Sequence, residues 1–347
     1  MGRIDAQDAL VRRPGRGSVI STDDTTTFRA SNVDTIANSA WWKGRVLRSI
    51  LLLGMLAVGA TVLAVGWDTY SEILSEANPA WLILAVAFLM LGNLTSALLA
   101  TELLRSRGNN APASGVARVV LVSNMAKYVP GFVLQMATFY KLSLGIGLVG
   151  RQAWLLLLET TWLILLAAAA VGSLSLLLVD STVPVAVSAL VLGSALVLAA
   201  PRVRDLLLRA VRLVPRSEAA LGNLQPKAAS LAILGVVALG FHGVALARGV
   251  GADDLSWLEA TAALAGGWIV GLLFVVFPGG LGPREVAATA LLAQFTDPEV
   301  AVLIVVLSRL ASVVADLLMG AAALIPAVDA APAQSQRQPH SSLPTPD

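Results

Sequence analysis

Long apolar runs without a charged side chain constrain this sequence more than any other feature. Residues 49–67 and 80–101 contain no Asp, Glu, Lys or Arg, and a helix of about 20 such residues crosses the hydrocarbon core of a bilayer. The chain is 56% hydrophobic and only 13% charged, whereas a soluble domain is about 25% charged. The sequence therefore predicts an all-α integral membrane protein, because helices in lipid satisfy their own backbone hydrogen bonds.

Further apolar segments extend this prediction to a polytopic bundle of about seven or eight transmembrane helices. We expect full spans over residues 49–67, 80–101, 152–179, 182–200, 227–247, 257–277 and 299–325. Asn93, inside the second span, is expected to hydrogen-bond across helices as a packing contact rather than as part of a site. Residues 202–216 have basic and apolar side chains on opposite helical faces, which fits a helix on an anionic inner leaflet or one packed on the bundle.

Basic residues gather in four segments that flank the spans. These segments are residues 1–48, 102–107, 141–151 and 202–227. An excess of Lys and Arg marks cytoplasmic loops, so we expect a multi-pass protein of the cell (inner or plasma) membrane with a cytoplasmic N-terminus. Residues 1–45 are expected to be a disordered basic tail, residues 46–325 the transmembrane domain, and residues 326–347 a disordered C-terminal tail.

Cysteine and histidine usage narrows the chemistry. The sequence has no cysteine and only two histidines, His242 and His340, which excludes thiol nucleophiles and argues against a histidine-based zinc or catalytic site. No nucleophile–base pair or cluster of carboxylates suggests an enzyme, so we expect no catalytic activity, cofactor or metal. The basic segments have the composition of juxtamembrane loops, and we expect no nucleic acid partner.

Two apolar stretches are broken by proline, glycine and charge. They are Asn124–Gly131 and Phe277–Glu285. A helix cannot continue through the proline of either break, and the new helix that follows exposes amide hydrogens and a positive dipole end, which suit a phosphate. Lys127 and Arg284 add full positive charge there. Because the two pieces of residues 111–144 are too short to cross a bilayer, we expect a re-entrant hairpin.

Six charged residues fall inside or beside these apolar segments. They are Lys127, Glu159, Arg284, Glu285, Arg309 and Asp316. Each would cost about 2.5–3.5 kcal/mol at the bilayer centre, so they should face one another or a wet cavity. Two interpretations remain open: a path for a substrate, or internal ion pairs, such as Glu159 with Arg309, that only fix the packing.

A weak internal repeat relates the two halves of the chain. The spans that begin near residues 49, 80 and 152 and the break at 130 form one set. The spans near 228, 257 and 299 and the break at 278 form the other. Broken segments at matching positions of two halves are a pointer to a transporter's central site. The expected sides of the spans do not by themselves give an inverted repeat.

The broken segments resemble a known family. Lys127 to Gly131, with Gln135 after it, resembles the N-x-x-K-Y-[IVL]-P-G segment of the lysylphosphatidylglycerol synthase transmembrane family, and Phe277–Glu285 resembles its P-x-G-x-G-x-R-E signature. Ser308-Arg309-Leu310 is similar to an arginine position in the family's last span, and the resemblance covers about residues 46–325. It implies the following candidate site: Lys127, Tyr128, Pro130, Gly131, Pro278, Gly280, Gly282, Arg284, Glu285 and Arg309.

This resemblance implies a membrane protein that moves an anionic or amphiphilic lipid between leaflets. The partner would be an anionic phospholipid or a polyprenyl-phosphate-linked lipid. From their charges, we expect Lys127 and Arg284 to hold a phosphate, and Glu159 and Glu285 to balance charge or meet an amino head group. Full-length lipid-modifying members carry a soluble aminoacyl-transferase domain after the membrane part, whereas residues 326–347 here are a polar tail, so we expect no aminoacylation by this chain. The alternative is a membrane subunit without transport that recruits a glycosyltransferase or another cell-envelope enzyme.

Overall fold

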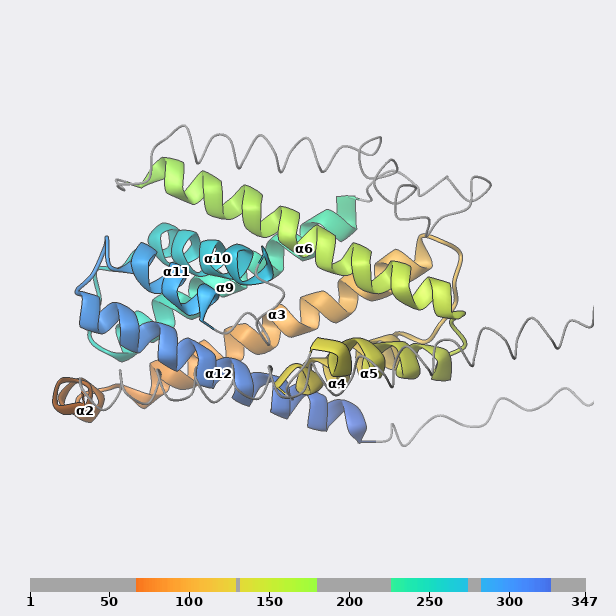
Figure 1. Cartoon of the computed structure of the whole chain (residues 1–347), viewed down its shortest axis with the longest axis horizontal. Coiled ribbons are helices and arrows are strands. Elements are labelled where there is room, and N and C mark those ends of the chain that lie inside the picture. Colours follow the sequence, from red (N-terminus) through yellow and green to blue (C-terminus); the bar gives the residue numbers. More distant parts are fainter. Residues whose placement is uncertain (1–66, 129–131, 180–225, 274–281, 326–347) are drawn as a thin grey trace, which may run out of the picture. The chain divides into compact units, whose positions relative to one another are not determined.

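A computed structural model of the chain describes residues 67–128, 132–179, 226–273 and 282–325, all within one compact unit, Leu51–Asp347. These residues form helices joined by short connections (Figure 1), which confirms the all-α prediction for this part of the chain. The expected tails, 1–45 and 326–347, lie outside the described residues, as do most of the expected span 49–67, the span 182–200 and the helix 202–216.

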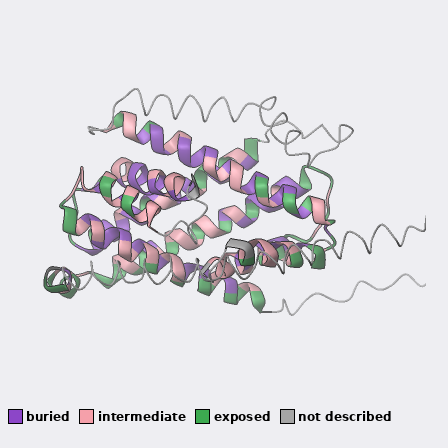
Figure 2. Ribbon diagram, viewed as in Figure 1, coloured by how far each residue is buried: buried purple, intermediate pink, exposed green. Residues whose placement is uncertain are grey.

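Four helices of the described part are long and apolar enough to cross a membrane. They are α3 (Pro79–Arg105), α6 (Gly150–Leu178), α9 (Pro226–Gly249) and α12 (Pro298–Leu324). At 24–29 residues they are about 36–44 Å long, which exceeds a hydrocarbon core of about 30 Å. Figure 2 shows buried residues where these helices meet and exposed ones on their outer sides. Apolar side chains such as Ile83 and Leu310 remain exposed there, as expected of a surface that faces lipid.

Helix starts follow the local sequence. Proline occupies the first turn of α3 and α12 and of the shorter helix α11 (Pro283–Leu292), because its missing amide hydrogen has no helical partner there. Asn78 caps α3, and its side chain accepts a hydrogen bond of 3.0 Å from the amide of Ala80. The new helix that the sequence predicts after the second break begins at Pro283.

The first broken segment is a hairpin of short helices, as predicted. It consists of α4 (Ala113–Met125), the 3₁₀ turn η1 (Ala126–Tyr128) and α5 (Phe132–Gly145). A Cβ atom on Gly115, near the start of α4, would lie 3.0 Å from Cγ2 of Ile146, just beyond α5. The two open ends of the hairpin thus lie together. With 13 residues, α4 is only about 20 Å long, so the hairpin ends within the bundle.

The second broken segment is also a hairpin, which differs from the expectation that residues 257–277 form a separate crossing. The helix α10 (Trp257–Leu273) packs antiparallel against α11. Cβ atoms on Gly267 and Gly271 would lie 2.7 Å from Cβ of Ala288 and of Arg284, respectively. Glycine on this face of α10 lets the backbone of α11 approach closely, and this contact turns the chain back beside α10.

This close approach predicts that Gly267→Ala destabilises the protein by about 1–3 kcal/mol, since an added methyl must push the two helices apart. Its Cβ would also meet the backbone oxygen of Arg284 at 2.8 Å, which cannot rotate away. Thermal unfolding in detergent measures the effect. The control is Gly145→Ala at the end of α5, where an added Cβ meets nothing within 4 Å. Equal stability of the two variants would contradict the proposed close contact.

The two halves of the described chain form an inverted repeat. The amide of Asn78, before α3, donates to the carbonyl of Gly249 at the end of α9 (2.9 Å), and Lys227 at the start of α9 is 2.8 Å from Glu102 near the end of α3. These contacts make α3 and α9 antiparallel. Because one hairpin follows α3 and the other follows α9, the hairpins enter the bundle from opposite ends (Figure 1).

Packing partners correspond across this repeat. The α4 helix packs on α12, and the α10 helix packs on α6 in the same way. The contact of α3 with α12 corresponds to that of α9 with α6, and the contact of α5 with α6 corresponds to that of α11 with α12. The repeated unit is therefore helix, hairpin, helix: α3 to α6 and α9 to α12. The pairing expected from the sequence, which matched the spans at 80 and 257, is wrong because residue 257 begins a hairpin arm.

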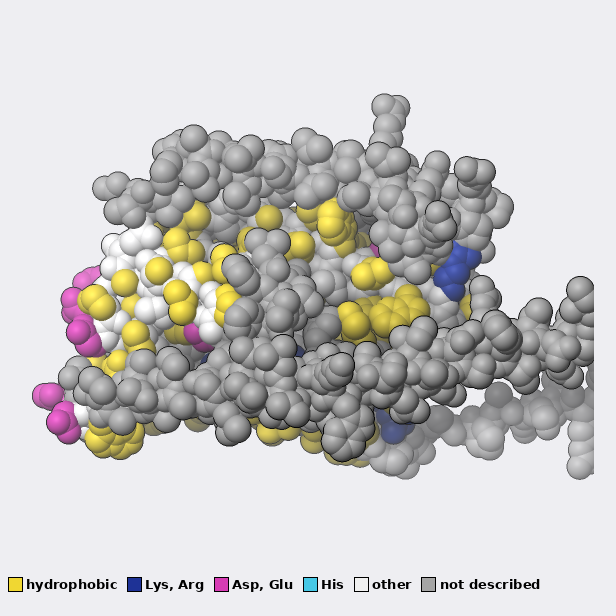
Figure 3. Space-filling view, in the orientation of Figure 1, with side chains coloured by type: hydrophobic (Ala, Val, Ile, Leu, Met, Phe, Trp, Pro, Cys, Tyr) yellow, Lys and Arg dark blue, Asp and Glu magenta, His cyan; other side chains and the backbone are white. Residues whose placement is uncertain are grey.

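Charge separates the two ends of the bundle. On the face drawn in Figure 3, Asp and Glu side chains show at the left and Lys and Arg side chains at the right. The end at which α3 begins and α9 finishes carries Asp68, Glu72, Asp253, Asp254, Glu259 and Glu299; the opposite end carries Arg105, Arg107, Lys141, Arg151 and Lys227. The described basic segments thus share one end, as the sequence predicted.

Candidate functional site

Both hairpins reach one cavity of about 360 Å³ inside the bundle. Lys127 of η1 and Arg284 of α11 line it, together with Arg309 and Asp316 of α12. Because the hairpins enter from opposite ends, the two breaks meet within the bundle rather than at separate surfaces. The sequence predicted this meeting of Lys127 and Arg284 at one polar place.

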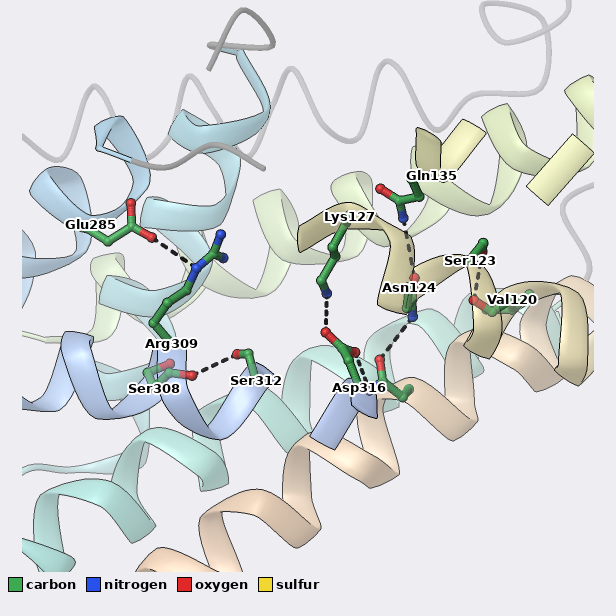
Figure 4. Close-up of polar contacts among 11 residues, drawn as sticks. Val120, Ser123, Asn124, Lys127, Gln135, Glu285, Ser308, Arg309, Ser312 and Asp316 are labelled. Carbon is green, nitrogen blue, oxygen red and sulfur yellow. Dashed lines mark hydrogen bonds and ion pairs between the residues drawn. The ribbon is translucent and has the colours of Figure 1, made fainter. Parts of the chain in front are cut away.

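Lys127 forms an ion pair with the carboxylate of Asp316 in this cavity (Figure 4). Its Nζ lies 2.6 Å from Oδ2 of Asp316, whose side chain is only 2% exposed, whereas that of Lys127 is 27% exposed. Asn93 of α3 donates from Nδ2 to Oδ1 of the same carboxylate at 2.9 Å. The carboxylate therefore connects the first hairpin to both α12 and α3.

Side-chain amides extend this network towards the tip of the first hairpin. Asn124 donates from Nδ2 to Oδ1 of Asn93 at 3.3 Å, and Gln135 donates from Nε2 to Oδ1 of Asn124 at 3.4 Å. All three amides line the cavity. Asn93 thus makes the interhelical hydrogen bond expected from the sequence and also belongs to the cavity wall, an interpretation that the sequence analysis had not favoured.

Arg309 and Glu285 form a second pair, between α12 and α11. Nε of Arg309 lies 3.6 Å from Oε1 of Glu285, and Oε2 of Glu285 accepts a hydrogen bond of 2.7 Å from the amide of Gly282. Gly282 has a φ of +92°, which glycine adopts without strain. The carboxylate in the first turn of α11 thus already holds one amide at this helix start, so the positive charge offered to a ligand comes chiefly from side chains.

Three cavity residues lie on one face of α12. Arg309, Ser312 and Asp316 all line the cavity, and Figure 4 shows them along the side of α12 that faces the first hairpin and α11. This spacing places residues on a common helical face. The sequence analysis named Asp316 among the buried charges but left it out of the candidate site, although its helical spacing from Arg309 could have included it.

Glu159 lies apart from this cavity. It pairs with Arg107, which follows the end of α3, and its side chain is buried near the basic end of the bundle. Thr160 and Thr161, the next residues of α6, line the cavity whereas Glu159 does not. The sequence analysis suggested that Glu159 pairs with Arg309. In the structure Glu159 pairs with Arg107, and Arg309 pairs with Glu285.

The remaining candidate residues can be placed only in part. Tyr128 ends η1 at the first hairpin tip, and Gly282 precedes α11 at the second. Pro130, Gly131, Pro278 and Gly280 lie outside the described residues.

His242, fully buried in α9, is the only histidine within the described ranges and is used for packing. Its Nδ1 lies 3.0 Å from the carbonyl oxygen of Ala85 in α3, and its Nε2 lies 2.9 Å from Oγ of Ser308 in α12. The ring thus links three helices, and it does not line the cavity.

Charge and shape together define what the cavity can hold. Its wall carries the cations Lys127, Arg284 and Arg309 and, among the described residues, one carboxylate, Asp316. Amide groups add neutral donors, and Phe139 and Trp268 contribute apolar surface. Its volume falls at the lower end of the range for small-molecule sites. Such a chamber suits an anionic group, because charged donors form the strongest hydrogen bonds to phosphate and carboxylate oxygens.

Comparison of the chain with models of known protein families gave no match, and a search among curated proteins gave no relative.

Proposed function

We propose that this protein moves an anionic or amphiphilic lipid between membrane leaflets and holds its phosphate head group near Lys127 and Arg284. The observation that carries the proposal is the shared cavity, to which the two hairpins bring these cations from opposite ends of the bundle. Inverted repeats with broken helices that meet around a central site are the architecture of many secondary transporters. The lipid's tails stay in the bilayer while its head group passes through the cavity.

Electrostatics favours an anion over a cation as cargo. The cations that line the described cavity outnumber its carboxylate, so the cavity attracts a head group with negative charge. The apolar outer faces of the bundle suit contact with acyl or polyprenyl chains. We place the basic end in the cytoplasm, because Lys and Arg accumulate in cytoplasmic loops.

The family resemblance supports the same function. Lys127 and Arg284, from the two segments that resemble the lysylphosphatidylglycerol synthase transmembrane family, line the cavity, as does Arg309, from the third similar position. We therefore keep that family as the proposed relationship. The cargo within the proposal is an anionic phospholipid or a polyprenyl-phosphate-linked lipid.

Reconstitution into vesicles tests this function. Purified protein is inserted into vesicles that contain a fluorescent phosphatidylglycerol or a fluorescent polyprenyl phosphate, and a membrane-impermeant quencher reports how fast the inner-leaflet label reaches the outside. We expect faster exchange than in protein-free vesicles for at least one of the two lipids. Exchange at the protein-free rate for both lipids would sink the proposal.

A further inference from the structure

Asp316 already binds the Lys127 ammonium, the cation to which the anionic head group would bind. It is the most buried charged side chain of the described cavity wall, and each of its oxygens has a donor: Lys127 at 2.6 Å and Asn93 at 2.9 Å. A phosphate that approaches the ammonium of Lys127 therefore meets a carboxylate already bound to it. This competition follows from the proposed function and concerns the same site.

Two anionic groups cannot share this place without compensation. A phosphate beside Lys127 would bring a second negative charge within a few ångströms of the Asp316 carboxylate, inside the bundle, where like charges repel more strongly than in bulk water. Moving Asp316 away is restricted, because α12 packs tightly here: a Cβ on Gly320, one turn further along, would meet Met125 of α4. Neutralising the carboxylate removes the repulsion without moving the helix.

The other groups around Asp316 leave it as the proton acceptor of the described cavity wall. From η1 it faces Lys127, which the lipid would engage; from α11 it shares the cavity with Arg284. Arg309, on its own helix, pairs with Glu285. The helix α3 contributes the neutral Asn93 and α4 the neutral Asn124, while His242 of α9 contacts Ser308 and Ala85. Among the described residues that line the cavity, Asp316 is the one group able to accept a proton as a carboxylate.

We propose that binding of the anionic head group at Lys127 is coupled to uptake of one proton by Asp316. In this step a proton from solvent adds to Oδ2 as its contact with the Lys127 ammonium is lost, and the resulting carboxylic acid donates its O–H to a phosphate oxygen. Asn93 continues to donate to Oδ1. The cavity with one anion and one added proton carries the same net charge as the empty cavity, so the coupled step leaves the interior charge unchanged.

Calorimetry of lipid binding tests the coupling. Short-chain phosphatidylglycerol and, in a second series, a short-chain polyprenyl phosphate are titrated into the full chain in uncharged detergent at neutral pH. Each titration is run in two buffers with different ionisation enthalpies. The difference in heat gives the number of protons taken up per lipid bound. We expect about one proton per lipid for the wild-type protein. Asp316→Asn should still bind the lipid but lose this proton uptake.

Glu299→Gln provides the matched control. It makes the same carboxylate-to-amide change on the same helix, in the exposed first turn of α12, and should keep the wild-type proton count. Lipid binding by the wild-type protein without proton uptake would overturn the coupling and leave the proposed function standing, whereas absence of binding for both lipids would count against both. Should Asp316→Asn fail to fold, the wild-type proton count still decides whether lipid binding is coupled to proton uptake. An Asp316→Asn protein that takes up the wild-type number of protons overturns the assignment to Asp316.

Discussion

Lys127→Met is expected to lower the free energy of unfolding by about 3–5 kcal/mol, because it removes the cation that faces a buried carboxylate. Asp316 is 2% exposed and would keep its desolvation cost after the attraction to Lys127 is gone. The neutral donor Asn93 offsets only part of that cost. Chemical or thermal unfolding in detergent measures the change.

The double variant Lys127→Met with Asp316→Asn should recover much of this loss, because the buried negative charge disappears together with its counter-ion. Lys227→Met is the surface control: Lys227 also pairs with a carboxylate, Glu102, but its side chain is 67% exposed, and such pairs contribute less than about 1 kcal/mol. A Lys127→Met protein that is no less stable than Lys227→Met would show that the cavity pair contributes no more than a surface contact.

Most of the helical framework could be predicted from the sequence, since apolar length and proline positions act locally. The spans over α3, α6, α9 and α12 and the division of residues 111–144 into two short helices follow from these signals alone. The second hairpin could not be predicted, because residues 257–277 are apolar enough to be taken for a transmembrane helix. Only the contacts of Gly267 and Gly271 with α11 reveal that α10 turns back, and sequence does not say which helix a glycine face meets.

The same limit applies to the candidate site. Lys127, Arg284 and Arg309 were predicted to face one another or a wet cavity, because a charge in an apolar segment needs a polar neighbour. All three line the cavity. Which neighbour each one has depends on tertiary packing. Thus Asp316, distant in sequence from Lys127, emerged as its partner, and Glu159 was found with Arg107 instead of at the cavity. The sequence indicates where charge is buried, and the fold decides the pairs.

Arg284→Gln is expected to slow leaflet exchange of the labelled lipid by roughly 10- to 150-fold. A hydrogen bond to a charged group contributes about 1.5–3 kcal/mol, and each 1.4 kcal/mol changes a rate or binding constant tenfold. Arg284 lies in the first turn of α11 and lines the cavity from the second hairpin, so its loss lowers the positive charge offered to the head group. Arg284→Lys keeps the charge and should retain more of the exchange than Arg284→Gln.

Arg248→Gln is the matched control for this prediction. Its guanidinium lies 5.1 Å from the ring centre of Trp81 at the acidic end of the bundle, away from the lining of the cavity, so exchange should stay close to the wild-type rate.

The Arg284→Gln variant also separates transport from recruitment of an envelope enzyme. A recruiting subunit would lose its cellular effect when residues 1–45 are deleted and keep it in Arg284→Gln. A lipid translocase would lose both exchange and cellular effect in Arg284→Gln, because the head group then lacks one of the cations that draw it into the cavity.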